Sequence, residues 1–292
     1  MKTSCHSEYG QLKRVLVKRP QQAFINPERI NAQWKELNFL AAPDLKLAEA
    51  QFEQFESLLT LRGATLEYLP QDDSVTLDSM YCRDAAIATD RGMILCSMGK
   101  PARKPEPMAE RKALESAAIP ILGVIELPGT LEGGDVAWLD EKNLAVGHTY
   151  RTNWEGIRQL KHWVEPMGVH VWVAEMPHYK GPADVFHLMS VFSPVDKNLA
   201  VVYSPLMPIS FRKGLLEHGI EFVEVPDEEW ESMGCNVLAI APREVIIVKG
   251  NPVTRQRLEA AGCQVHEYEG SEISLKGGGG PTCLTRPIER LI

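Results

Sequence analysis

The chain has 292 residues, 44% of them hydrophobic, and its 39 acidic and 31 basic residues give a formal net charge of −8 at pH 7. This acidic balance argues against nucleic acid as a partner, because phosphate backbones are bound by clustered basic residues. The first residues lack the apolar core of a signal peptide, and no run reaches the roughly 18 uncharged residues of a membrane span. We therefore expect a cytoplasmic protein with no membrane or nucleic-acid partner.

The first predicted helix covers residues 45–59, where apolar residues recur at intervals of three and four. Pro43-Asp44 is placed to begin this helix and Gly63 to end it, and a strand over 66–69 follows. The same order of helix, glycine and strand recurs along the chain, with one weaker copy that lacks the glycine. The later copies are expected at 107–118 with 119–127, at 157–164 with 169–173, at 211–218 with 220–225, and at 254–261 with 264–268.

Five such units follow one another roughly every 50 residues, a period typical of propellers, solenoids and arrays. Further short apolar runs between the helices make each unit rich in strands; they lie at 93–96, 135–139, 144–147, 199–203, 237–241 and 244–248. No Ser- or Gly-rich linker divides the chain. We therefore expect an α/β protein in which five αβ units form a closed ring, as one domain over residues 1–292. A doubly wound sheet with irregular spacing is the alternative.

The six cysteines show no C-x-x-C spacing, so neither a zinc knuckle nor a disulfide framework is predicted. One of them, Cys283, directly follows the run Gly277-Gly278-Gly279-Gly280-Pro281-Thr282. Glycine is used where the backbone needs φ > 0 or approaches a ligand, so we expect this run to clear the space in front of Cys283 rather than to contribute packing. A flexible surface loop is the alternative.

Carboxylates and a histidine occur in three further motifs. Glu132-Gly133-Gly134-Asp135 places two carboxylates around a glycine pair, which suits a planar cation with several N–H donors; an acidic hairpin turn is the alternative. Asp84 follows Arg83, and a surface ion pair between them is the alternative to a ligand-binding carboxylate. His187 is flanked by apolar residues, so it is either a poorly solvated site residue or a core histidine.

In combination and in this order, five motifs resemble those of the guanidino-group-modifying enzymes, which include the arginine deiminases, the dimethylarginine dimethylaminohydrolases and the amidinotransferases. The motifs are Tyr81-Cys82-Arg83-Asp84, Leu131-Glu132-Gly133-Gly134-Asp135, Gly147-His148-Thr149-Tyr150-Arg151-Thr152-Asn153, His187-Leu188-Met189-Ser190 and Gly278-Gly279-Gly280-Pro281-Thr282-Cys283. The resemblance spans about residues 15–288. It implies the pentein fold, a five-bladed αβ propeller with pseudo-fivefold symmetry.

The resemblance also implies roles for individual residues. Cys283 would be the nucleophile, His187 the general acid and base, and Glu132 and Asp84 the carboxylates that bind the substrate guanidinium. The remaining substrate-binding candidates are Asp135, Asn236, Arg151 and Arg103, the two arginines being expected at the amino-acid end of the substrate. Either arginine could instead be a solvated surface residue. The implied partner is a small cationic guanidino compound, with no cofactor; the oligomeric state, including a homodimer, stays open.

Two departures from the family pattern bear on the substrate. Deiminases typically carry an aspartate two residues after the catalytic histidine, whereas this chain has Met189, which cannot accept hydrogen bonds from an unsubstituted guanidinium. We therefore expect a methylated arginine or another substituted guanidino compound to be preferred. The Arg83-Asp84 pair and the glycine-proline approach to Cys283 look more like the deiminases.

Other functions also stay open. Transfer of the amidino group to a second amine is the alternative within the enzymes, and a ribosome-binding factor of the same fold is the non-enzymatic alternative. A metal site made by Cys283, His187 and Glu132 is not expected, because their spacing differs from that of structural zinc sites. Residues 20–40 are a candidate lid over the site, with a surface helix as the alternative.

Overall fold

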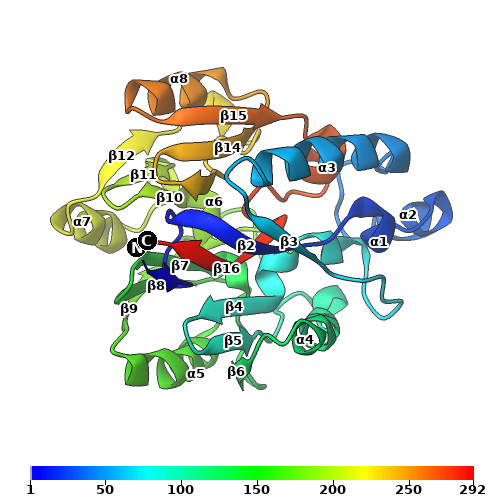
Figure 1. Ribbon diagram of the computed structural model, residues 1–292, viewed down its shortest axis with the longest axis horizontal. Coiled ribbons are helices and arrows are strands. Elements are labelled where there is room, and N and C mark those ends of the chain that lie inside the picture. Colours follow the sequence, from blue (N-terminus) through cyan, green and yellow to red (C-terminus); the bar gives the residue numbers. More distant parts are fainter. Residues whose placement is uncertain (1) are drawn as a thin grey trace.

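The computed structural model describes residues 2–292 and divides its strands among five small sheets (Figure 1). Their strand orders are β1-β16-β2-β3, β4-β5-β6, β7-β8-β9, β10-β11-β12 and β13-β14-β15. The strands are β1 Thr3–Ser4, β2 Gln11–Val17, β3 Thr65–Tyr68, β4 Ala86–Thr89, β5 Gly92–Leu95, β6 Ile121–Val124, β7 Val136–Asp140, β8 Asn143–His148, β9 His170–Glu175, β10 Phe192–Asp196, β11 Leu199–Val202, β12 Glu221–Glu224, β13 Leu238–Ala241, β14 Glu244–Val248, β15 Gln264–Tyr268 and β16 Thr285–Leu291. Five separate sheets contradict the doubly wound alternative.

Every sheet has the same connectivity. In each three-stranded sheet the first two strands are antiparallel and the third is parallel to the second, with a helix in the connection between them, and β16, β2 and β3 repeat this pattern in the four-stranded sheet. In the central part of the chain, for example, Val136 of β7 lies opposite Val146 of β8, and Val146 lies opposite Val173 of β9. The α-helices are α1 Pro20–Ala23, α2 Pro27–Gln33, α3 Leu45–Leu59, α4 Glu106–Ser116, α5 Trp154–Val164, α6 Leu188–Val191, α7 Ile209–Glu217 and α8 Pro252–Ala260.

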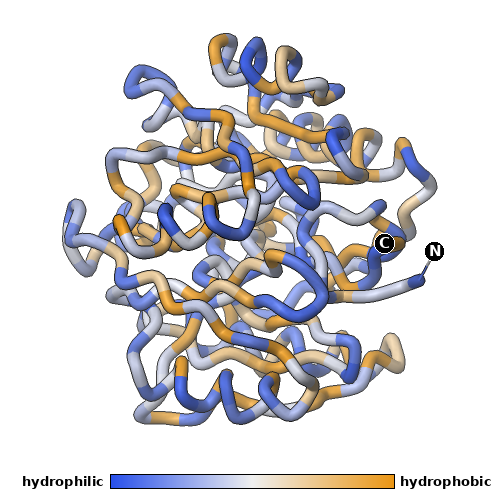
Figure 2. Tube along the Cα trace, turned by 90° about the vertical axis from the view of Figure 1, so that its left-hand side faces the viewer, coloured by the Kyte–Doolittle hydropathy of each residue, from blue (hydrophilic) through white to orange (hydrophobic). Residues whose placement is uncertain are grey.

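The two ends of the chain complete one sheet together. Strand β16, at the C-terminus, occupies the first-strand position beside β2, and the short β1 pairs with the outer edge of β16. The N- and C-termini therefore lie side by side in both views (Figures 1 and 2). Hydrophobic and hydrophilic stretches alternate over short distances along the chain (Figure 2). Among residues 2–292, none of the helices has the length and apolar character needed to cross a membrane.

Helix α3 forms where the apolar spacing predicts it. The Asp44 side chain accepts a hydrogen bond from the Leu47 backbone N–H at 2.8 Å, which satisfies one of the free donors at the helix start. The apolar stripe, including Phe52 and Phe55, is buried in a core cluster between α3 and the strands. Gly63 adopts φ +76° shortly after the helix ends. The other four connecting helices also form within a few residues of their predicted ranges.

The first strand of several sheets escaped prediction, and β16 shows the cause. Two arginines on this strand, Arg286 and Arg290, are buried, so the strand lacks an apolar alternation. The Arg290 Nη1 donates to the backbone carbonyls of Gly10 and Ala239, which lie on neighbouring segments. Charged residues that donate hydrogen bonds to backbone carbonyls in the interior interrupt the apolar alternation, so a hydropathy pattern does not predict the strand.

Candidate active site

Five chemically active side chains occupy one position of the topology, the segment that leads into the first strand of each sheet. Asp84 lies in the 3-10 helix η2 (Cys82–Ala85) before β4, and Glu132 precedes η4 (Gly133–Asp135) and β7. His187 begins α6 before β10, Asn236 precedes β13, and Cys283 precedes β16. Each of the five sheets therefore supplies one candidate site residue from the segment before its first strand. The sequence predicted that such loops from separate repeats would come together.

Four of these five residues line a single cavity of about 250 Å³: Asp84, His187, Asn236 and Cys283. Part of the cavity wall comes from residues 37–40, which end the segment proposed from sequence as a lid, and from 179–186, the loop that leads to His187. These two segments meet where the Asn38 side chain donates to the Ala183 carbonyl at 3.4 Å. The segment 20–40 also contains helices α1 and α2, and its role as a lid stays a prediction.

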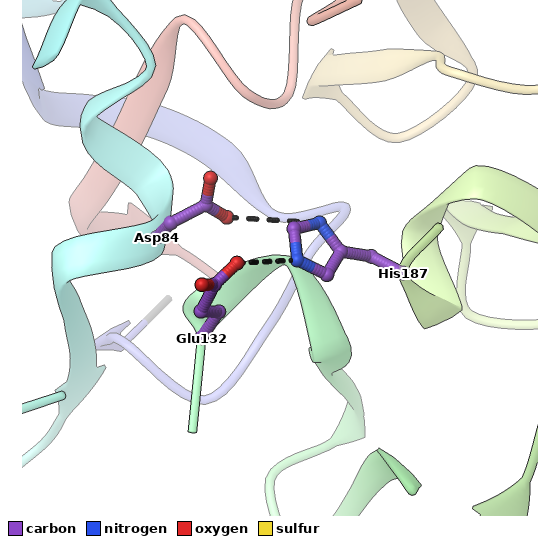
Figure 3. Close-up of side chains that lie close together, drawn as sticks. All are labelled: Asp84, Glu132 and His187. Atoms are coloured by element: carbon purple, nitrogen blue, oxygen red, sulfur yellow. Dashed lines mark hydrogen bonds and ion pairs between the residues drawn. The ribbon is translucent and has the colours of Figure 1, made fainter. Parts of the chain in front are cut away.

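His187 lies between two carboxylates (Figure 3). Its Nε2 is 2.8 Å from Glu132 Oε2, and its Nδ1 is 4.0 Å from Asp84 Oδ1. Burial alone would lower the pKa of His187, but the charges of Asp135 and Asp84 and the hydrogen bond to Glu132 outweigh it and raise the pKa to about 9. The imidazole is therefore protonated at neutral pH, and it can donate a proton to a bound molecule.

Glu132 is fully buried and does not border the cavity. Besides His187, its carboxylate accepts the Lys100 backbone N–H at 3.0 Å and faces Arg151 Nη1 at 3.4 Å. Burial raises the pKa of the Glu132 carboxyl, but the hydrogen bond and charge of His187, with Arg151, outweigh it and hold the pKa well below its usual range. Glu132 is thus the ionised partner of a protonated His187 in this structure, and it lies behind the imidazole.

Of the three predicted site carboxylates, Asp84 is the one that reaches the cavity, and two fixed donors hold it there. Arg103 Nη1 donates to its Oδ2 at 2.5 Å, and the Gly134 backbone N–H donates to its Oδ1 at 2.8 Å. A Cβ at Gly134 would lie 2.4 Å from His187 Nδ1 and 2.7 Å from Asp84 Oδ1, so the glycine lets histidine and aspartate approach each other. The alternative of an Arg83–Asp84 surface pair is wrong, because both side chains are buried and Arg83 pairs with Glu8 at 2.7 Å.

Asp135, predicted to bind substrate, has its carboxylate turned away from the cavity. Its Oδ2 accepts the Thr149 and Thr152 hydroxyls at 2.7 and 2.6 Å, and its Oδ1 accepts the Leu188 backbone N–H at 2.9 Å. Burial raises the pKa of Asp135 to about 6, against the opposing charge of His187 and these hydrogen bonds. Its contacts fix the start of α6 and therefore the backbone that carries His187.

The two candidate arginines differ in their free donors. Arg103 is buried and makes five hydrogen bonds, to Glu106, Asp84 and the carbonyls of Asp78 and Tyr81. Arg151 also lines the cavity, but its contacts with Glu132 and with the Asp184 carbonyl are 3.3 to 3.4 Å long, and its buried Nε has no partner within residues 2–292. Arg151 is therefore held less firmly than Arg103 and has an unpartnered Nε, which makes it the better candidate to bind a ligand carboxylate; neither arginine is a solvated surface residue.

Cys283 faces the cavity beside Asn236. The Asn236 Nδ2 lies 3.5 Å from the sulfur. Burial and the charge of Asp84 raise the pKa of the thiol, whereas the neighbouring Thr282 and Asn236 side chains and the charge of Arg83 act in the opposite direction. Cys283 is therefore a neutral thiol at neutral pH.

The glycine run before Cys283 does contribute packing, which corrects the sequence expectation. A Cβ at Gly279 would lie 2.4 Å from the Tyr81 ring, and a Cβ at Gly280 would lie 2.5 Å from the Asn236 amide. The glycines therefore let this loop pack directly on two side chains that line the cavity. The flexible-loop alternative is wrong for the same reason.

Six further charged residues that line the cavity were missed in the sequence: Asp78, Lys100, Lys180, Asp184, Glu231 and Lys276. Lys100 Nζ donates to Asp78 Oδ2 at 2.6 Å and to the Leu37 carbonyl at 3.0 Å, at the edge formed by residues 37–40. Asp78 lies in η1 (Leu77–Met80), the short helix before the one that carries Asp84, and that short spacing between two acidic residues is the available signal. In residues 2–292, ligand atoms of Asp84, Glu132 and His187 lie within 4.8 Å of one another, close enough for a metal ion.

The sequence is similar to proteins of known and unknown activity. It is 28% identical over 289 residues to the uncharacterized protein YkgA of Bacillus subtilis strain 168, covering 99% of this chain and 96% of that protein. It is 30% identical over 253 residues to the arginine deiminase of Listeria innocua, covering 72% of this chain and 61% of the deiminase. This chain thus spans less than two thirds of the deiminase.

Solved structures share the fold. Dimethylarginine dimethylaminohydrolase from Pseudomonas aeruginosa, in a complex with citrulline, superposes with a TM-score of 0.76 at 23% sequence identity, covering 94% of this chain and 98% of that one. A family profile described as N,N dimethylarginine dimethylhydrolase, eukaryotic, matches residues 19–290. The match covers nearly the whole chain and includes the five motifs. The chain therefore belongs to the N,N dimethylarginine dimethylhydrolase family, within the pentein superfamily of guanidino-group-modifying proteins.

Proposed function

We propose that the protein is a hydrolase acting on the guanidinium carbon of an arginine-derived substrate, with methylated arginine as the preferred substrate and citrulline and an amine as products. One observation carries this proposal: Cys283, a protonated His187 and Asp84 border the same cavity, on equivalent segments of three sheets. We further propose that the five sheets are the blades of one αβ propeller domain, since their connectivity is the same and the first sheet is completed by both chain ends.

The first step is attack of the Cys283 sulfur on the guanidinium carbon. Because His187 is already protonated, the resting thiol releases its proton to solvent as the cationic substrate binds, and the positive charge next to the sulfur offsets the effect of Asp84. Asp84 accepts hydrogen bonds from the planar cation and holds its carbon near the sulfur. The new S–C bond gives a tetrahedral adduct, His187 donates its proton to the departing nitrogen, the C–N bond breaks, and a thiouronium remains on Cys283.

The second step is hydrolysis. His187, neutral after the first step, takes a proton from water as the water oxygen attacks the thiouronium carbon. The S–C bond then breaks, the Cys283 thiolate leaves, and the ureido product is released. Glu132 stabilises the charged imidazole and fixes its orientation through the 2.8 Å contact with Nε2.

The cavity wall supports a substituted guanidinium. Met189 lies two residues after His187 and lines the cavity, so N–H groups pointing toward it find no acceptor in its side chain. Each buried donor left unpaired costs about 1–3 kcal/mol, whereas an N-methyl group meets an apolar surface there. At the other end, Arg151 is the residue that we propose to bind the substrate carboxylate, and Arg103 is a positioning residue for Asp84.

The test is a panel of guanidino compounds with purified protein, in which ureido product and released amine or ammonia are both measured. We expect dimethylarginine to be hydrolysed at least about ten-fold faster than arginine, as one unpaired donor implies, and Cys283→Ser to form no product. A preference of that size for arginine would instead favour the deiminase activity of the Listeria relative.

Two other activities are measured in parallel. Glycine or ornithine added as an acceptor gives a new guanidino product only if the protein transfers the amidino group. Absence of product from every compound, together with cosedimentation with ribosomes, would support the non-enzymatic alternative. Activity that is lost on chelator treatment and restored by a metal would assign the Asp84, Glu132 and His187 group to metal binding.

A further inference from the structure

Asn236 is the one side chain among the five equivalent positions whose chemistry is unassigned in the proposed mechanism. It is 8% exposed, it precedes β13, and it was grouped with the substrate-binding residues in the sequence. The segment before β13 occupies the same position in its sheet as the segments that carry Asp84, Glu132, His187 and Cys283. Its side chain, however, is directed at the loop of the nucleophile.

Hydrogen bonding fixes the orientation of the Asn236 amide. The Thr282 backbone N–H, which can only donate, lies 3.0 Å from Oδ1, so the atom facing it must be the carbonyl oxygen. The Thr282 hydroxyl also lies 2.9 Å from the same oxygen. The NH₂ group therefore faces the Cys283 sulfur, at 3.5 Å. If the amide were flipped, its NH₂ group would face the Thr282 backbone N–H, which is also a donor. The orientation of the amide therefore follows from hydrogen bonding alone.

Donors to the sulfur are few. The Thr282 Oγ1 is 3.9 Å from Sγ, but its single hydrogen is directed to Asn236 Oδ1 at the shorter distance of 2.9 Å. The Arg83 guanidinium is paired with Glu8 and with the Thr282 carbonyl. Among residues 2–292, this leaves the Asn236 NH₂ as the donor in contact with the sulfur.

We propose that Asn236 is a catalytic residue that stabilises the Cys283 thiolate as a neutral hydrogen-bond donor. The inference rests on the proposed role of Cys283 as nucleophile. A neutral donor has a specific advantage here, because a lysine or an added imidazolium beside the sulfur would repel the cationic substrate, while an amide dipole stabilises the anion without that repulsion. Gly280 is required for this contact, because any side chain there would displace the amide.

The test follows the thiolate itself, in the absence of substrate. Rates of iodoacetamide alkylation of Cys283 are measured by mass spectrometry of its peptide across pH, and the 240 nm thiolate absorbance is taken as a difference from Cys283→Ser. We expect Asn236→Ala to lower the alkylation rate at pH 8 about ten-fold, the effect of one hydrogen bond to a charged group. Asn236→Asp, which is nearly isosteric but lacks the donor and adds a negative charge, should lower it further.

Thr282→Val is the matched control. It removes the hydroxyl but keeps the backbone N–H that orients Asn236. Because the lost bond is neutral and does not involve the sulfur, the alkylation rate should fall less than about three-fold. An unchanged pH profile in Asn236→Ala and in Asn236→Asp, with circular dichroism and melting that match the wild type, would overturn the proposal, as would a larger loss in Thr282→Val. Because no substrate is present, failure of the proposed hydrolysis would leave this result intact, and the two proposals fail separately.

Discussion

The two sides of the cavity use different means to control a proton. On the His187 side, three buried carboxylates lie close to one imidazole, and their charges keep it protonated in spite of burial. On the Cys283 side, the sulfur is contacted by an amide, with a hydroxyl slightly further away, and it keeps its proton. On the His187 side ionic charge decides the protonation state, whereas on the Cys283 side burial and the charge of Asp84 keep the proton and the neighbouring donors are neutral.

A cationic substrate explains this difference. A protonated histidine next to an ionised glutamate adds little net charge, so it can serve as an acid without repelling a guanidinium. A permanent thiolate would need a positive neighbour, which would compete with the substrate for Asp84. A neutral thiol that ionises as the substrate binds avoids this competition, and it confines the reactive sulfur to the complex.

The largest expected effect comes from removing the acid of the charged side. His187→Gln should lower kcat for dimethylarginine by about 10³-fold, within the range typical for a general acid and base, while alkylation of Cys283 continues. The readouts are steady-state kinetics and the alkylation rate. The matched control is His266→Gln, which removes a histidine 3.1 Å from a glutamate, Glu244, away from the cavity. Retained turnover in the His187 variant would contradict the division of roles between the two sides.

A smaller effect is expected from Gly134→Ala, which separates the histidine from Asp84. The added Cβ would lie within 2.4 Å of His187 Nδ1, so the imidazole must move, and a displacement on this scale costs about 10²-fold in kcat. Gly214→Ala in α7 is the control, because its Cβ would meet only the edge of the Trp172 ring, at 3.0 Å. If kcat changes by less than about three-fold, the approach of His187 to Asp84 is not needed for turnover.

The sequence predicts the site residues better than it predicts their contacts. Motifs around Asp84, Glu132, His187 and Cys283 are local, because each needs only a few adjacent residue types in a segment before a strand. The partners are distant in sequence: Glu132 and His187 are separated by 55 residues, and Asn236 and Cys283 by 47. Nothing local shows that Glu132 lies behind the imidazole rather than on the cavity wall.

The connecting helices were predictable because the residues that define each helix lie close together in the sequence. Helix α3 has its apolar stripe and cap within 16 residues, which is information that the sequence contains locally. Strand β16 gains its place from pairing with β2, at the other end of the chain, and it contains buried arginines that bind backbone carbonyls. The role of Asp135 was equally hidden, since its partners lie on the segments that follow β8 and begin α6.

Met189→Asp tests the apolar side chain on the His187 side of the cavity, and it should change the preference for dimethylarginine over arginine by about ten-fold. A carboxylate at this position would accept the N–H groups of an unsubstituted guanidinium, which Met189 cannot. The ratio of kcat/KM for dimethylarginine to that for arginine is expected to fall by that factor, with total activity lowered because a further buried charge is added. Met233→Asp, on another part of the cavity wall, is the control, and it should leave the ratio unchanged. An unchanged ratio in Met189→Asp would remove the argument for methylated substrates.

The smallest expected effect is on the pH dependence of stability. It distinguishes the His187 side from the Cys283 side in the absence of substrate. The pKa of His187 is raised to about 9 from its ordinary 6.5, so its contribution to stability is fully present below about pH 6.5 and is lost as pH rises through 9. The pKa of Glu132 is depressed, so its contribution is present above its ordinary 4.5 and is lost as pH falls toward its folded value. The pair therefore stabilises the fold most between about pH 4.5 and 6.5.

Glu132→Gln should abolish most of this dependence. Subtracting its melting temperature from that of the wild type across pH 4 to 10 isolates the pair from other titrating groups, including Glu106 and Glu110, whose pKa values burial raises to about 7 and about 8. We expect a difference of a few °C, on the scale of about 2–4 °C per kcal/mol for a chain of this size, that is largest near pH 5.5 and shrinks toward pH 10. Cys283→Ser should give a difference that is flat from pH 4 to 8, because the thiol is neutral throughout that range. A flat difference for Glu132→Gln would mean that His187 is neutral in the resting protein, and the contrast between a charged and a neutral side would then fail.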